Sequence, residues 1–315
     1  MKKPLIVIAG PTASGKTSTS VALAKRINGE IISADSMQVY RGMTIGTAKV
    51  SEEEMSGVRH HMIDVLNPDD AFSIAKFQKM VKEAMADIYS RGKVPILAGG
   101  TGFYIQAIVN DINFVESESD PIYRKSLEEQ GQTSAGSQVL FAQLMAVDPE
   151  SCAAIHMNNT KRVIRALEYY HLTGEKISVH NATEKNKTSP YKVGFYVLTM
   201  ERDLLYQRIN DRVDRMMADG LLEEVKELLD KGYDPSLVSM QGLGYKEIVA
   251  FLQGECSLQA SVDLLKRDTR RFAKRQLTWF RREALSRWVD VTEFNYNIEG
   301  IVNFIVKDIE VNKIL

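Results

Sequence analysis

The sequence is poor in cysteine and has no long apolar run. Only two cysteines, Cys152 and Cys256, occur among 315 residues, far apart and without a neighbouring Cys or His pair. This spacing argues against a disulfide framework and a zinc site, and it favours the reducing cytoplasm. No apolar run approaches the roughly 20 residues of a transmembrane helix. The five apolar residues between Pro4 and Gly10 are too few for a signal peptide. We therefore expect a cytoplasmic protein without a membrane segment.

The sequence also lacks an excess of either charge. It has 40 Lys and Arg residues against 41 Asp and Glu residues, a net charge of −1. This balance excludes a uniformly basic nucleic-acid binder, so any contact with RNA must come from a local basic patch. With 44% apolar residues, the chain can bury the core of one large domain or of two moderate ones.

Short apolar segments alternate with amphipathic ones in the N-terminal third. Buried strands are predicted for residues 5–9, 30–34 and 94–98, and a later strand for 193–198. Amphipathic segments at 18–26 and 73–91 separate the first three strands. Continuous apolar strands in strand–helix–strand order are typical of a parallel sheet with helices on both faces. The expected fold class is α/β.

The middle of the chain has a different character. Two polar segments without periodicity flank a region in which helical periodicity returns. We interpret 115–190 as a helical lobe inserted into a core of 1–114 and 191–315. The alternative is that 115–190 consists of long peripheral segments of a single domain. Beyond residue 198 the pattern predicts helices at 204–219, 221–231 and 257–287.

Residues 10–17 match the phosphate-binding loop (P-loop) pattern G-x-x-x-x-G-K-[ST] without a mismatch. They are Gly10, Pro11, Thr12, Ala13, Ser14, Gly15, Lys16 and Thr17. The loop follows a predicted strand and opens a predicted helix, which is the context that supports the motif. Its glycines let backbone N–H groups and the helix N-terminus face a phosphate. Lys16 adds positive charge, and the Thr17 hydroxyl can bind Mg²⁺.

The residues after the other predicted strands limit the kinds of ligand that the P-loop is expected to bind. The sequence has no guanine-selecting N-K-x-D element, and Gly99–Thr101 stands where many P-loop ATPases place the metal-binding aspartate. This disfavours an ATP-driven motor and leaves a transferase whose substrate carries a diphosphate or triphosphate. Asp35 follows strand 30–34 and should lie beside the loop. A carboxylate there can accept a proton from a nucleophile or hold Mg²⁺ through water. Capping of the next segment is the alternative.

Eight recognisable blocks follow one another over nearly the whole chain. They are Gly10–Thr17, Asp35–Met43, Ile45–Lys49, His60–Asp64, Gly99–Thr101, Lys161–Glu168, Gln241–Lys246 and Ala273–Arg281. Together they resemble the tRNA dimethylallyltransferase (tRNA isopentenyltransferase) family. Eukaryotic members carry a C-terminal zinc finger that this sequence lacks, so a bacterial-type enzyme is implied.

The resemblance implies a reaction. The dimethylallyl group of dimethylallyl diphosphate is transferred to N6 of the adenine 3′-adjacent to the anticodon in tRNA, and diphosphate is released. The P-loop and Mg²⁺ would hold the diphosphate, and the adenine would be flipped out of the anticodon loop. Asp35 matches the general base, Thr101 the residue that places the amine, and Arg212 an active-site contact. For Arg212, an exposed helix charge paired with Asp211 or Asp214 is the alternative.

A basic cluster lies between Lys266 and Arg282. It has eight basic residues and one acidic residue, a net charge of +7. Most of the cluster recurs near one face of the predicted helix, as expected for a surface that binds a phosphate backbone. A solvated helix is the alternative. From this cluster we expect contacts between tRNA and Arg271, Lys274 and Arg275.

The resemblance also implies that the lobe 115–190 binds tRNA. It implies further residues along the path of the tRNA anticodon stem-loop. They are Asp35, Ser36, Met37, Gln38, Thr101, Arg124, Lys161, Arg162, Val163, Ile164, Arg165, Gln241, Gly242, Leu243, Gly244, Tyr245 and Lys246. The twin histidines His60 and His61 lack an acidic or cysteine partner at ligand spacing, so we prefer a structural role for them to a metal site.

We expect the protein to be a monomer. Two other functions remain open at this stage. One is a P-loop small-molecule or nucleotide kinase in which Asp35 activates a hydroxyl. The other is an RNA-binding regulator that uses a nucleotide as a switch. The basic cluster argues against the kinase, which rarely needs such a surface. Asp35 and Thr101 argue against the switch, which needs no base.

Overall fold

A computed structural model describes residues 2–114, 120–185 and 187–315 in two compact units. The first unit comprises Met1–Val109 and Ser189–Leu315, and the second comprises Asn110–Thr188. The lobe boundary expected at residue 115 falls outside the described residues. No helix of the described chain has both the length and the apolar character needed to cross a membrane.

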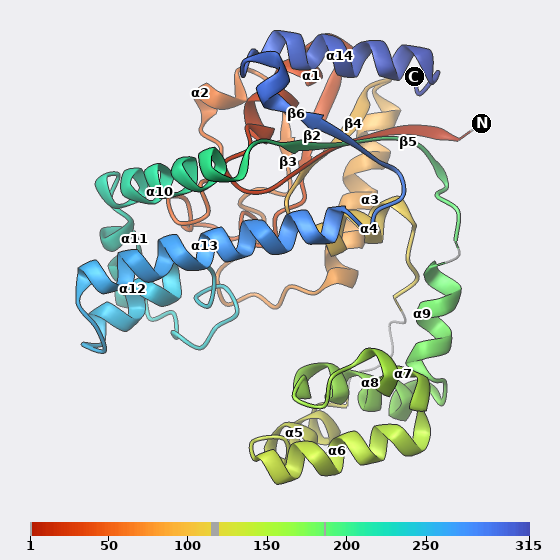
Figure 1. The fold of residues 1–315 in the computed structure, drawn as a ribbon, viewed down its shortest axis with the longest axis vertical. Coiled ribbons are helices and arrows are strands. Elements are labelled where there is room, and N and C mark those ends of the chain that lie inside the picture. Colours follow the sequence, from red (N-terminus) through yellow and green to blue (C-terminus); the bar gives the residue numbers. More distant parts are fainter. Residues whose placement is uncertain (1, 115–119, 186) are drawn as a thin grey trace. The chain divides into compact units, whose positions relative to one another are not determined.

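The first unit is built on one six-stranded sheet with the order β3-β2-β4-β1-β5-β6, in which all pairs are parallel (Figure 1). The strands are β1 Lys3–Ala9, β2 Gly29–Ser33, β3 His60–His61, β4 Val94–Gly99, β5 Tyr191–Thr199 and β6 Ser286–Asp290. The predicted α/β class with a parallel sheet is confirmed, and so are its four predicted strands. The sequence pattern missed β3, which has only two residues, and β6.

Helices cover both faces of this sheet. They are α1 Lys16–Ile27, α2 Glu52–Met55, α3 Ile74–Ser90, α4 Gly102–Val109, α10 Arg202–Ala218, α11 Leu221–Asp230, α12 Tyr245–Leu252, α13 Leu258–Phe280 and α14 Ile298–Val311, with a 3₁₀ helix at Val291–Phe294. The expected helices at 204–219 and 221–231 correspond to α10 and α11. The expectation of a helix over 257–287 is wrong at its C-terminal end, because α13 stops at Phe280 and residues 286–290 form β6.

Alternation along the strands divides the core into two layers. Leu5, Val7 and Ala9 of β1 belong to one cluster, together with residues of α3 and α4. Ile6 and Ile8 point to the other cluster, which includes residues of α1 and α14. Figure 1 shows α1 and α14 together on one side of the sheet and α3 and α4 on the other. Because β1 is central and fully buried on both faces from Leu5 onward, the loop that follows it is held rigidly.

The second unit is helical. Its helices are α5 Pro121–Gln130, α6 Ser134–Val147, α7 Pro149–Ala154, α8 Thr160–Thr173 and α9 Ile177–Lys185. A small core contains Leu140, Leu144 and Val163, each fully buried. Asp148 caps α7 and also accepts hydrogen bonds from the backbone and hydroxyl of Ser178, so it ties α9 to α7.

Candidate active site

The P-loop residues connect β1 with α1. Gly10 has φ 150° directly after the strand, and Gly15 has φ 88° at the N-cap of α1. A Cβ atom at Gly10 would lie 2.7 Å from the carbonyl oxygen of Leu198 in β5, so no larger residue fits there. The chain therefore turns tightly at the carboxyl end of the sheet and leads into a helix N-terminus, where backbone N–H groups favour an anion.

Lys16 lies at the centre of a group of charges. Its Nζ donates a hydrogen bond to the carbonyl oxygen of Pro11, 2.7 Å away within the same loop. Burial, and to a lesser extent the positive charge of Arg212, lower the pKa of Lys16 to about 7, although the negative charge of Asp35 acts in the opposite direction. Burial also lowers the pKa of Arg212, and Asp35 again opposes this shift. The P-loop, the end of β2 and α10 therefore bring these three charges together.

Asp35 and Thr101 follow neighbouring strands. The Thr101 N–H donates to the carbonyl oxygen of Ala34, 3.4 Å away, so Thr101 lies beside the residue that precedes Asp35. Oδ1 of Asp35 accepts a hydrogen bond from the Met37 N–H at 2.9 Å. This is the capping role considered as an alternative, and it occupies only one of the two carboxylate oxygens. Within the described residues no hydrogen bond to Oδ2 is found, which leaves that oxygen available to a ligand.

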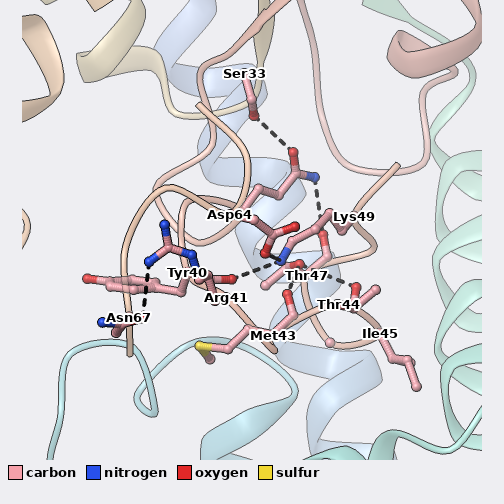
Figure 2. Close-up of polar contacts among 12 residues, drawn as sticks. Ser33, Tyr40, Arg41, Met43, Thr44, Ile45, Thr47, Lys49, Asp64 and Asn67 are labelled. Carbon is pink, nitrogen blue, oxygen red and sulfur yellow. Dashed lines mark hydrogen bonds and ion pairs between the residues drawn. The ribbon is translucent and has the colours of Figure 1, made fainter. Parts of the chain in front are cut away.

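The segment after Asp35 is fixed by polar contacts. Gln38 Oε1 accepts from the Ser33 hydroxyl at 2.9 Å, and its Nε2 donates to the carbonyl oxygens of Thr47 and Ala48. Figure 2 shows Lys49 between Asp64 and the Tyr40 carbonyl, at 2.6 and 2.8 Å. The Gln38 amide is thus engaged within the protein, and it shapes the segment that carries Asp35, Ser36 and Met37.

The loop 241–246 packs against this segment. A Cβ atom on Gly242 would lie 2.5 Å from Cε of Met37. Tyr245 is fully buried and donates its hydroxyl proton to Glu224, which also accepts backbone N–H groups from residues 44–46. Contact of the Tyr245 side chain with tRNA is therefore incompatible with its burial, and Tyr245 supports the loop instead. Gln241 is exposed, Lys246 is partly exposed, and Leu243 and Gly244 lie between them.

Helix α13 presents part of the predicted basic cluster to solvent. Arg271, Lys274 and Arg275 are exposed. Arg270 is half-buried and donates to Asn210 of α10, so it belongs to the helix packing. The last two residues of the basic cluster, Arg281 and Arg282, lie beyond α13, which ends at Phe280.

In the sequence, Gln276 stands out only as a polar residue within the basic cluster, and no motif identifies it as a site residue. The structure buries its side chain between the P-loop and the end of β4, where it bonds to Thr12 and Gly100. Gln276 shares a helical face with Ala273 and Phe280, which are buried, and this spacing is the one signal that could have identified it.

In the second unit, the predicted RNA-binding residues divide into exposed and buried groups. Lys161 and Arg162 are exposed. Arg124 and Arg165 are half-exposed and share the buried carboxylate of Glu168, at 3.2 and 3.1 Å. The side chains of Val163 and Ile164 lie in the core of the unit, so the expectation that they contact tRNA is corrected to a packing role.

The twin histidines have structural partners. His61 Nε2 bonds with the buried carboxylate of Glu30 at 2.8 Å, and His60 Nδ1 bonds with the Val58 carbonyl oxygen at 2.9 Å. Arg91 and Lys93 also pair with Glu30, and their positive charges lower its pKa strongly. This cluster fastens β3 to β2, as the preferred structural role requires.

Comparisons with known proteins agree along the whole chain. Residues 38–283 match the family model described as IPP transferase. The tRNA dimethylallyltransferases of Lachnoclostridium phytofermentans and Bacillus subtilis are 57% and 50% identical to this chain, over 93% and 92% of both partners. A crystal structure of the tRNA isopentenylpyrophosphate transferase from Bacillus halodurans is 48% identical, with a TM-score of 0.74, and the match covers 99% of this chain and 98% of that one. A eukaryotic dimethylallyltransferase acting on tRNA is 30% identical, with a TM-score of 0.80, over 93% of this chain and 75% of its own. The chain belongs to the IPP transferase family, that of the tRNA dimethylallyltransferases.

Proposed function

We propose that this chain transfers the dimethylallyl group of dimethylallyl diphosphate to N6 of the adenine 3′-adjacent to the anticodon in tRNA, and releases diphosphate. The observation that carries the proposal is that Lys16, Asp35 and Arg212 lie together at the P-loop. It occurs in a chain whose relatives are tRNA dimethylallyltransferases. A phosphate site beside a carboxylate is what displacement of diphosphate by an amine needs.

The P-loop is the proposed donor site. Besides Lys16 and the helix N-terminus, it offers the Ser14 hydroxyl, which is buried and has no hydrogen-bond partner within the described residues. A buried hydroxyl without a partner costs free energy, and a phosphate oxygen would satisfy it. The loop is thus prepared for an anion that stabilises it.

Mg²⁺ would fit the same end of the loop. The Thr17 hydroxyl is exposed at the first turn of α1 and has no hydrogen bond to another described residue. The described chain has no group of three or more His, Cys, Asp or Glu side chains that could hold a metal by itself. The ligands of Mg²⁺ would therefore be the Thr17 hydroxyl together with phosphate oxygens and water, a ligand set that Mg²⁺ often has in proteins. When bound, it neutralises charge on the diphosphate.

Asp35 is the proposed general base. As the bond between N6 and the allylic carbon forms and the bond to diphosphate breaks, a proton must leave the amine, and Oδ2 of Asp35 can accept it. Thr101, beside Ala34, is placed to orient the amine, which makes the encounter effectively unimolecular. Arg212 and Lys16 stabilise the negative charge that develops on the leaving diphosphate.

The tRNA contacts are proposed on the exposed basic residues of each unit. In the first unit these are Arg271, Lys274 and Arg275, with Gln241 and Lys246 nearer the Asp35 segment. In the second unit they are Lys161, Arg162, Arg165 and Arg124, so that this unit serves as the tRNA-binding lobe. We further propose a cytoplasmic monomer, because both cysteines are free and one chain supplies every reacting group named above.

One experiment tests the function against its alternatives. The protein is incubated with unmodified tRNA and either labelled dimethylallyl diphosphate or labelled ATP. Transfer of the prenyl label to the adenine beside the anticodon supports the proposal. Transfer of phosphate to a small molecule would identify a kinase, and binding of ATP and tRNA without transfer of either label would identify a regulator.

A further inference from the structure

The buried side chain of Gln276 connects the basic helix α13 to the P-loop. Gln276, only 7% exposed, lies near the C-terminal end of α13. Its Oε1 accepts a hydrogen bond from the Thr12 N–H at 3.1 Å, and its Nε2 donates to the carbonyl oxygen of Gly100 at 3.0 Å. Because one partner only donates and the other only accepts, the two bonds together fix the orientation of the amide.

The backbone around Gln276 is shaped to receive it. A Cβ atom at Gly100 would lie 2.1 Å from Nε2 of Gln276, and a Cβ atom at Gly102 would lie 2.4 Å from the Trp279 ring. The turn between β4 and α4 therefore closes against α13 only because glycine stands on each side of Thr101. Gln276 thus links Gly100, which precedes Thr101, to Thr12 of the P-loop.

The Thr12 peptide is held by a contact from outside the P-loop, in addition to the bond from Lys16 to the Pro11 carbonyl oxygen within it. The internal turn of the loop, from the Ser14 N–H to the Pro11 carbonyl oxygen, is long at 3.4 Å. The bond from Thr12 to Gln276 is shorter and comes from a side chain packed in another element. A loop that presents several N–H groups to one anion gains affinity only if its peptide planes are already oriented. A constraint on the Thr12 peptide therefore acts on the anion site itself.

We propose that Gln276 is a positioning residue that holds the P-loop in register with Thr101, so that the diphosphate and the attacking amine are aligned. The proposal rests on the proposed role of the P-loop as donor site. It assigns to α13 a second role, on the face opposite to its exposed basic residues. Gln276 touches neither reactant in this proposal and acts through the backbone of Thr12 and Gly100.

The first test compares Gln276→Met with Gln259→Met, a matched change at an exposed position of the same helix. Methionine keeps the length of the side chain and removes both hydrogen bonds. Since it leaves a buried N–H and a buried carbonyl unpaired, we expect kcat/KM for the donor to fall at least about tenfold. The Kd for tRNA should stay within about twofold, and Gln259→Met should match the wild type in both constants. A joint loss of donor and tRNA affinity with a lower Tm would show that Gln276 only packs the helix, and would overturn the proposal.

The second test uses Gln276→Glu and pH. An ionised glutamate can accept from Thr12 but cannot donate to Gly100, whereas a protonated glutamic acid can do both. Burial near a diphosphate favours the protonated form as pH falls. The ratio of variant to wild-type kcat/KM for the donor should therefore rise from pH 8 to pH 5.5. Lys16 on α1, Asp35 after β2 and Arg212 on α10 are present in both enzymes, so the contributions of these three groups to the pH dependence largely cancel in the ratio.

A ratio that does not change with pH contradicts the role of the two hydrogen bonds, whatever the effect of methionine. Lys16→Ala separates this failure from failure of the donor site. If Lys16→Ala leaves the donor constants unchanged, the P-loop is not the donor site, and both proposals fall. If Lys16→Ala impairs donor binding while the Gln276 variants behave as the wild type, only the role of Gln276 is overturned.

Discussion

The position of Lys16 predicts that donor binding depends on pH in the neutral range. In the free protein its pKa is lowered to about 7 by burial, with a further contribution from Arg212. A bound diphosphate places negative charge beside the ammonium group and raises this pKa. Above pH 7 the free protein holds Lys16 largely neutral, so binding of the donor must take up a proton. Donor affinity is therefore highest below pH 7 and falls progressively as pH rises above that value.

The magnitude follows from the fraction of charged Lys16. That fraction is one half at pH 7 and about one hundredth at pH 9, so the Kd for the donor should rise roughly fiftyfold between these values if the complex keeps Lys16 charged. Phosphate groups have a second pKa near ~6, so the donor itself changes little over this range. Calorimetric titration in buffers of different ionisation enthalpy measures both the Kd and the proton taken up.

Two variants make the prediction specific to Lys16. Lys16→Arg keeps a charged side chain at every pH of the experiment, so its Kd, whatever its absolute value, should not change between pH 7 and pH 9. Asp35→Asn removes the charge that raises the pKa of Lys16, so the midpoint of the profile should move to lower pH. A wild-type Kd that is constant from pH 7 to pH 9, or a Lys16→Arg profile as steep as that of the wild type, would refute the reasoning.

Three further experiments test the remaining roles. Asp35→Asn should lower the single-turnover rate at saturating donor by ~10²–10⁴, because the amide cannot accept the amine proton, while tRNA affinity stays unchanged; a near-normal rate would exclude Asp35 as the base. Thr17→Ala should raise the Mg²⁺ concentration needed for half-maximal rate, and an unchanged Mg²⁺ dependence would exclude Thr17 as a ligand. Replacing Arg271 and Lys274 together by Glu should raise the Kd for tRNA and flatten its log–log salt dependence by roughly 0.7 to 0.9 per lost phosphate contact, with the donor KM constant. Unchanged tRNA affinity and salt dependence would move the search to Lys161–Arg165.

Local patterns made much of the first unit predictable from the sequence. The P-loop and its flanking strand and helix are contiguous, so one motif predicts all three. Strand β6 could not be found in this way, since it is short, lies close behind the end of α13, and has only Val289 buried among its five residues. The burial of Tyr245 was equally hidden, because it depends on Glu224 and on Gly46, which are distant in the sequence. A family block thus marks a segment without showing which of its side chains face solvent.

Helix α13 shows why a charge count could indicate a proposed RNA surface and still miss a buried residue beside the P-loop. Successive residues of a helix are about 100° apart, so neighbours in sequence can face opposite environments. Arg275 is exposed, whereas the adjacent Gln276 is buried against the P-loop. Substitutions one residue apart should therefore act on different substrates, tRNA for Arg275 and the donor for Gln276. That separation requires α13 to keep its orientation about its own axis. A rotation that moved Arg275 into the position of Gln276 would place a charged side chain against Gly100.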